Sequence, residues 1–170
     1  MENSTAEKYI LGIDPGYDRV GWAILSVKKR AITYISAGCI QTDKKQTLFQ
    51  RYQQIVAELA PILSTHQPED LAIETLFFAK NTSTALHVSE ARGIIIATAL
   101  AAGCQVYEYA PNQVKLSVTG TARADKQAVA KMVIHQINEK LPPKLLDDAI
   151  DAIAIGITHA LHTSANFPLS

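Results

Sequence analysis

The chain has 170 residues, of which 48% are apolar and 19% are charged, and its formal net charge at pH 7 is zero. This composition excludes a disordered chain and predicts a single folded domain over 1–170, which begins with a polar stretch over 1–7. No apolar run reaches the roughly 20 residues that cross a bilayer, and the first residues do not form a signal peptide, so we expect a cytoplasmic protein without a membrane segment. The two cysteines, Cys39 and Cys104, lack the spacing of metal ligands and are interpreted as buried thiols.

Two short apolar runs, Ile10–Asp14 and Gly21–Leu25, lie on either side of a Pro-Gly turn. Such runs predict buried strands, and their connection is too short for a helix, so the strands should pair antiparallel. The basic turn Lys28–Arg30 and the run Ala31–Ile40 predict a third strand of the same meander. Asp14 therefore ends a buried strand, where it either coordinates a ligand or caps the turn.

Later in the chain, strands alternate with helices. Apolar spacing over 48–63 predicts a helix that His66–Pro68 closes, and in which Pro61 either kinks the helix or lies in its frayed last turn. Asp70–Glu74 predicts a short buried strand that also ends on a carboxylate. The remaining predicted elements are a helix over 81–102, a strand over 105–110, a short helix from Pro111, a helix over 125–138 and a last helix over 145–162. This order predicts an α/β fold, with a mixed five-stranded sheet of three antiparallel strands and a parallel extension, flanked by helices.

Four carboxylates are candidates for a metal site. Asp14 and Glu74 end two strands, and Asp148 and Asp151 lie three residues apart on one face of the last helix. Asp147 with Asp151, four residues apart, satisfies helical spacing equally well. An all-oxygen set suits Mg²⁺ or Mn²⁺ and disfavours zinc, and bound cations would relieve the repulsion between the acids. The alternatives are a solvated strand end for Glu74 and first-turn helix acids for Asp147 and Asp148.

The distribution of charge gives a weaker indication of function. Residues 76–131 carry more Lys and Arg than Asp and Glu, whereas the flanking parts carry more acids, as expected for a phosphate-binding surface beside a metal site. Arg92 is interpreted either as a phosphate contact or as a partner of Glu90 or Glu108. Four histidines that are scattered singly are interpreted as surface or helix-packing residues: His87, His135, His159 and His162.

Several motifs, taken in order and with their spacing, resemble those of the RuvC family of Holliday-junction resolvases. They cover about residues 8–162 and comprise Gly12–Gly16 with Gly21, Ala72–Phe77 with Ala79–Asn81, Ala91–Gly93, Tyr109–Pro111, Val114–Lys115, Val118–Gly120, Ala124–Lys126 and Asp148–Ala154. The resemblance implies a ribonuclease H-like fold and a homodimer that cuts two opposed strands of a four-way DNA junction in recombination and repair. It also implies a branch-migration helicase as a partner.

The resemblance carries over Asp14, Glu74, Asp148 and Asp151 as metal-binding catalytic acids, and thereby prefers Asp148 to Asp147. It implies Mg²⁺ as the cofactor, with two ions in each active site and Mn²⁺ as a substitute. Phe77 matches an aromatic residue that stacks on unpaired bases at the junction centre. The expected DNA-binding residues are Phe77, Lys80, Lys115, Arg123 and Lys126.

Two positions depart from the family pattern near the predicted site. Ala122 stands where a second glycine is usual, and Tyr17 stands where a small hydroxyl residue is common. Two other functions share the predicted fold: a ribonuclease H-like nuclease acting on structured RNA, and a junction-binding protein that does not cut. The four acids argue against the second of these. A sugar kinase or actin-like ATPase opens with a similar hairpin, but needs a second lobe for which 170 residues leave no room.

Overall fold

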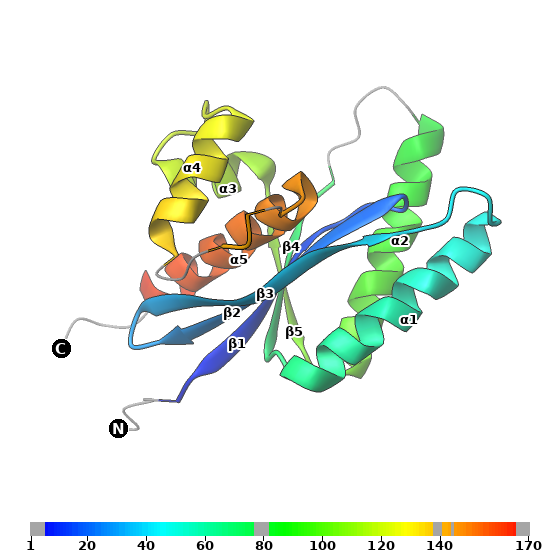
Figure 1. The fold of residues 1–170 in the computed structure, drawn as a ribbon, viewed down its shortest axis with the longest axis horizontal. Helices are drawn as coiled ribbons and strands as arrows, with labels where there is room; N and C mark the ends of the chain where they lie inside the picture. The colour runs from blue at the N-terminus through cyan, green and yellow to red at the C-terminus, as the bar shows by residue number, and fades with distance from the viewer. Residues whose placement is uncertain (1–5, 77–81, 138–140, 144, 166–170) are drawn as a thin grey trace.

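The computed structural model describes residues 6–76, 82–137, 141–143 and 145–165 (Figure 1). The predicted Phe77 and Lys80 therefore lie outside the described residues. The strands in these ranges are β1 (Lys8–Asp14), β2 (Arg19–Lys28), β3 (Ala31–Gln41), β4 (Asp70–Glu74) and β5 (Gln105–Tyr109). The helices are α1 (Leu48–His66), α2 (Thr82–Ala101), α3 (Pro111–Thr119), α4 (Lys126–Gln136) and α5 (Asp147–Ala165).

The five strands form one mixed sheet in the order β3-β2-β1-β4-β5. The meander β1-β2-β3 is antiparallel, and β4 and β5 extend it in parallel, which confirms the predicted topology. The central strand β1 pairs with both halves of the sheet, because its Ile13 lies opposite Trp22 on β2 and Ile73 on β4. The ends of β1 and β4 are therefore side by side.

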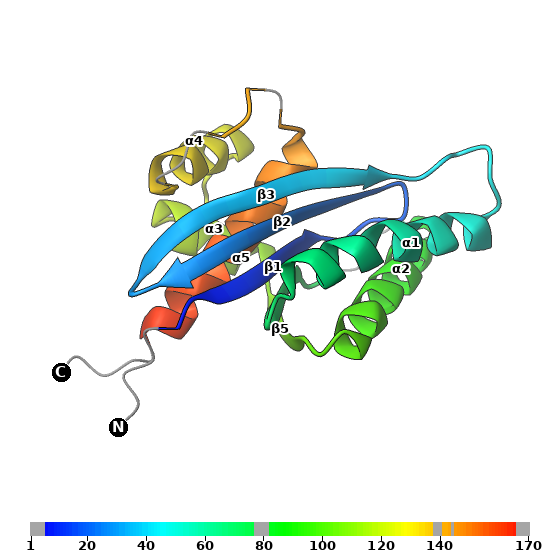
Figure 2. The same ribbon diagram turned by 60° about the horizontal axis from the view of Figure 1, so that its bottom comes forward.

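Helices cover both faces of the sheet, with α1 and α2 on one face and α3, α4 and α5 on the other (Figures 1 and 2). Alternation along the strands divides the core into two clusters. On β1, Leu11 and Ile13 pack toward α1 and α2, whereas Ile10 packs toward α5. Residues of the same parity as Ile10, which include Asp14, thus point to the α5 face.

Two helices differ from the prediction, α1 at Pro61 and α4 at its first residue. Helix α1 continues through Pro61 to His66, because the exposed proline ring points away from the core while Leu59 and Leu63 on either side are buried. Helix α4 begins at Lys126, since the Asp125 side chain caps it by accepting a hydrogen bond of 2.8 Å from the Ala128 amide.

Two glycines allow α5 to lie directly on the sheet. A Cβ added at Gly12 on β1 would overlap the carbonyl oxygen of Ala152, and one added at Gly21 on β2 would overlap that of Asp148. Larger residues here would push the helix outward. The glycines therefore bring the first turns of α5 against the strand end that carries Asp14.

Candidate metal centre

Asp14 and Glu74 are the last residues of β1 and β4, which are parallel neighbours. The side chains of both point to the face that α5 covers, because strand residues two apart share a face and Ala72 belongs to the α5-side cluster. Both carboxylates are half-buried. The sheet thus places two acids next to each other at one edge, beneath a helix.

Helix α5 supplies a third acid to this edge. Asp151 lines a cavity of about 320 Å³ together with Asp14 and Glu74, and Lys115 from α3 and Lys126 from α4 line the same cavity. The remaining lining is mostly apolar: Pro111, Val114, Val129 and Ala154. The cavity therefore joins three carboxylates and two ammonium groups over an apolar wall.

The carboxylates of this centre resist ionisation. Burial, followed by the charges of Asp151, Glu74 and Asp148, raises the pKa of Asp14 to about 7. Burial also raises the pKa of Glu74 and of Asp151, and the neighbouring ammonium groups of Lys115 and Lys126 offset part of each rise. The centre consequently carries more buried negative charge than its lysines neutralise.

Two cations already hold acids of this centre. Lys126 Nζ lies 3.1 Å from Asp151 Oδ2 and 3.6 Å from Asp147 Oδ2, and Arg19 forms an ion pair with Asp148. Within the described ranges, no three acidic, histidine or cysteine side chains already form a group that could hold a metal ion. Binding a metal through all four acids would therefore require Arg19 and Lys126 to give up their carboxylate partners.

The predicted site residues fall into three groups. Asp14, Glu74, Asp151, Lys115 and Lys126 line one cavity. Asp148 lies beside it and faces the start of β2 and the end of β3, with its Oδ2 3.8 Å from the Cys39 sulfur. Arg123 is exposed on the loop before α4, outside the cavity lining, and Phe77 and Lys80 lie outside the described residues.

Helical spacing left open whether Asp147 or Asp148 belongs to the centre, and the exposure of the two side chains distinguishes them. The side chain of Asp147 is 75% exposed, whereas that of Asp148 is 25% exposed and its charge acts on Asp14.

Arg92 pairs with Glu108, one of its two predicted partners, and its Nε donates a hydrogen bond of 3.0 Å to the carbonyl oxygen of Glu74. Arg92 thus supports the strand end that carries an acid of the centre.

Sequence reasoning missed two features. Arg19, which follows the Pro-Gly turn, carries no motif that would have predicted its pairing with Asp148. His159 is fully buried in α5, with Nε2 2.9 Å from Asp70 Oδ2 and Nδ1 2.8 Å from the Tyr109 hydroxyl. Its place on the core side of α5 was the available signal, but its polar partners come from β4 and β5.

The chemistry of the donor set fits a hard divalent cation. All donors are carboxylate oxygens, and burial followed by their mutual repulsion raises the pKa of Asp14 to about 7, a rise that a bound cation would oppose. Apolar residues on the cavity wall strengthen electrostatic interactions inside it.

This mixed sheet, with carboxylates at the ends of its central strands and on the helix that crosses them, places the chain in the ribonuclease H-like class of nucleases. The family model described as crossover junction endodeoxyribonuclease RuvC matches residues 10–159. The chain belongs to the RuvC family.

Relatives and solved structures agree with this assignment. The chain is 39% identical over 150 residues to the crossover junction endodeoxyribonuclease RuvC of Pseudothermotoga lettingae, covering 88% of this chain and 92% of the relative. It is 43% identical over 151 residues to that of Vibrio campbellii, covering 89% and 86%. The structure of Thermus thermophilus RuvC in complex with a Holliday junction substrate is similar, with a TM-score of 0.86, 31% identity, and coverage of 93% of this chain and 96% of that one. The yeast mitochondrial resolvase Ydc2, at 14% identity and a TM-score of 0.66, shares the fold.

Proposed function

We propose that this chain is a structure-selective endonuclease that resolves four-way DNA junctions by metal-assisted hydrolysis of phosphodiesters. The observation that carries the proposal is the convergence of Asp14, Glu74 and Asp151 in one cavity, with Asp148 beside it, in a member of the RuvC family. The similar Thermus thermophilus protein was solved with a Holliday junction substrate, which supports the same substrate class here.

The four acids would hold Mg²⁺, two ions per centre, with Mn²⁺ as a substitute. Bound there, such cations would supply an activated water at neutral pH and would stabilise the leaving 3′ oxygen, so that cleavage would leave 5′-phosphate and 3′-hydroxyl ends. The acids must be ionised to act as ligands, which is why the raised pKa of Asp14 matters for activity.

The lysines of the cavity act on the substrate. Lys115 and Lys126 project into the same space as the acids, where an ammonium group can neutralise a phosphate oxygen of the strand to be cut. Arg123, exposed on the loop before α4, would contact the backbone further out. We propose from their motif alone that Lys80 contacts the DNA backbone and that Phe77 stacks on a base.

Cutting two opposed strands requires two such centres, and we propose that a second copy of the chain supplies the other. Helix α2 is apolar beyond the face it packs on the sheet, with Leu86 58% exposed and Leu100 55% exposed. Beside them, Phe49 and Val56 of α1 and Ile94 of α2 line an apolar groove of about 500 Å³. An isologous contact across these helices would cover both features.

The cellular setting of the proposal follows from the family. The substrate is DNA, so we propose a cytoplasmic enzyme that acts with a branch-migration helicase. Among the helices that the structure describes, none combines the length and apolarity that crossing a membrane requires.

The test is cleavage of a labelled four-way DNA junction with Mg²⁺, beside linear duplex DNA and folded RNA, for the wild type and Asp14→Asn. We expect paired symmetric nicks in the junction alone, and their loss in the variant. Tight junction binding without cutting in Mg²⁺ or Mn²⁺ would establish a binding protein instead. Cleavage of the folded RNA would support the metal centre but would show that the substrate is RNA.

A further inference from the structure

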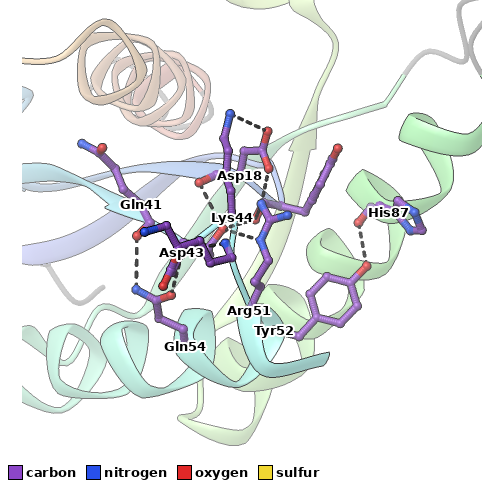
Figure 3. Close-up of polar contacts among 11 residues, drawn as sticks. Asp18, Gln41, Asp43, Lys44, Arg51, Tyr52, Gln54 and His87 are labelled. Carbon is purple, nitrogen blue, oxygen red and sulfur yellow. Dashed lines mark hydrogen bonds and ion pairs between the residues drawn. The ribbon is translucent and has the colours of Figure 1, made fainter. Parts of the chain in front are cut away.

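The loop that follows Asp14 is held by a buried arginine from another element. Arg51 on α1 is only 8% exposed, and its Nε donates a hydrogen bond of 2.9 Å to Thr42 Oγ1 (Figure 3). Its Nη2 donates one of 3.1 Å to the carbonyl oxygen of Tyr17 and pairs with the carboxylate of Asp18. One guanidinium thus ties α1 to the β1–β2 loop and to the segment after β3.

Thr42 closes this arrangement from the other side. Its hydroxyl donates a hydrogen bond of 2.8 Å to the same Tyr17 carbonyl, and its amide donates one of 3.0 Å to the Asp18 carbonyl. Lys44 Nζ lies 3.6 Å from Asp18 Oδ2, while Arg51 pairs with the other carboxylate oxygen. The two residues before β2 are therefore fixed at both carbonyls and at one carboxylate.

Tyr17, which departs from the family pattern, takes part through its ring. The Arg51 guanidinium lies 4.8 Å from the centroid of the Tyr17 ring, in cation–π contact. The edge of that ring meets His87 of α2 at a centroid distance of 5.5 Å. The larger side chain at this position packs toward α1 and α2 and gives the guanidinium an aromatic surface.

The loop that these contacts fix directly follows Asp14. Asp14 is the last residue of β1, and the chain leaves the sheet immediately after it through Pro15 and Gly16. Glu74 and Asp151 line the same cavity as Asp14, so these carboxylates repel one another when they are ionised. A fixed loop restrains Asp14 against that repulsion.

We propose that Arg51, with Tyr17 and Asp18, is a positioning clamp that holds Asp14 in the geometry needed to bind metal. Arg51 is a positioning residue, because the clamp reaches the centre only through the loop. The proposal rests on the proposed function only in taking Asp14 as a metal ligand. It applies whichever nucleic acid is cut.

The first test is Arg51→Lys, which keeps the charge and loses the fork that bonds Thr42 and Tyr17 together. Two properties are measured: Mn²⁺ affinity by calorimetry, and backbone order parameters of residues 16–18 by ¹⁵N relaxation without divalent cations. We expect Mn²⁺ to bind about tenfold more weakly, at the lower end of the range for residues that orient a ligand. The order parameters should fall from about 0.85 to below about 0.6.

The matched control is Tyr52→Phe, which alters the next residue of α1. It removes the hydroxyl that donates to Glu90 at 2.6 Å and to the His87 carbonyl oxygen at 3.3 Å, both on α2, and it leaves the hydrogen bonds of Arg51 and Thr42 to the loop in place. It should lower the melting temperature without changing Mn²⁺ affinity or the loop. Equal losses of Mn²⁺ affinity in both variants would show a purely structural role for Arg51 and overturn the proposal, as would unchanged affinity and order parameters in Arg51→Lys.

A second variant keeps the test decisive if Arg51→Lys does not fold. Asp18→Asn removes the charged partner of Arg51 at a partly exposed position, and Asp43→Asn removes the same charge from an exposed residue nearby. Asp18→Asn should weaken Mn²⁺ binding about threefold more than Asp43→Asn, since only Asp18 belongs to the clamp. Equal effects would overturn the proposal. Failure of the wild type to cut a junction would overturn the proposed function, and would leave these binding results standing.

Discussion

Asp14 links the acidity of the solution to the stability of the fold. Its pKa is raised from an ordinary value of 3.8 to about 7, chiefly by burial and then by the neighbouring acids. Between these values the folded state binds the proton more tightly than the unfolded chain does. The stabilisation that protonation provides is therefore complete below about pH 4 and is lost as the pH rises through about 7.

We predict that, in a chelating buffer, the melting temperature falls as the pH is raised from 5 to 8, and that Asp14→Asn reduces this fall. The amide cannot ionise, so the variant should be more stable than the wild type at pH 8. Thermal unfolding followed by circular dichroism measures both. Parallel curves for the two proteins would contradict the pKa assigned to Asp14.

If Asp148 binds a metal ion as proposed, Arg19 competes with that ion for its carboxylate. The ion pair of Arg19 with Asp148 is partly exposed, so solvent screening weakens it. We predict that Arg19→Met increases Mn²⁺ affinity by up to about fivefold, because it releases the carboxylate and removes a positive charge. Calorimetric titration measures the change, with Arg30→Met in the distant β2–β3 turn as control. Weaker binding in Arg19→Met would mean that Arg19 orients Asp148 for the metal.

At the level of elements, α5 is held at two places along its length. Near its start, Gly12 and Gly21 let it touch the sheet, and further along, His159 bonds Asp70 of β4 and Tyr109 of β5. One tautomer satisfies all three groups, with Nε2–H donating to Asp70 and Nδ1 accepting from the hydroxyl. The helix that carries two of the acids is thus tied to both strands of the parallel extension.

We predict that His159→Leu destabilises the protein by about 3–5 kcal/mol, because it leaves the Asp70 carboxylate buried without its partner. His162→Leu, on the exposed side of the same helix, should cost about 0.5–1 kcal/mol. Urea unfolding of both variants gives the comparison. Similar losses would show that the buried contact with Asp70 adds little.

The elements were predictable from sequence because their signals are local. Turn residues delimit β1 and β2, apolar periodicity marks α1, and Asp14 and Glu74 follow directly from the ends of short apolar runs. The roles of Arg19, Arg51 and His159 were not predictable, since each depends on one side chain meeting a partner far along the chain. Such contacts leave neither a period nor a spacing in the sequence.

At the scale of the whole molecule, the proposed dimer places the apolar surface of α1 and α2 between two copies. We predict that Leu100→Glu on α2 raises the dimer dissociation constant about tenfold or more, because a buried charge without a partner opposes association. Leu116→Glu on α3 is the matched control, since Leu116 is 53% exposed and Leu100 is 55% exposed. Sedimentation equilibrium measures both. A larger effect of Leu116→Glu would move the interface to α3.

The order of the elements along the chain also determines when the four acids can come together during synthesis. Asp14 lies on the first described strand, and Asp148 and Asp151 lie on the last described helix, so the acids come together only after most of the chain has left the ribosome. The meander and α1 can form early from contacts near in sequence, whereas α5 must close over a sheet that is already present. In a nascent chain the four acids therefore come together only once α5 has packed on the sheet.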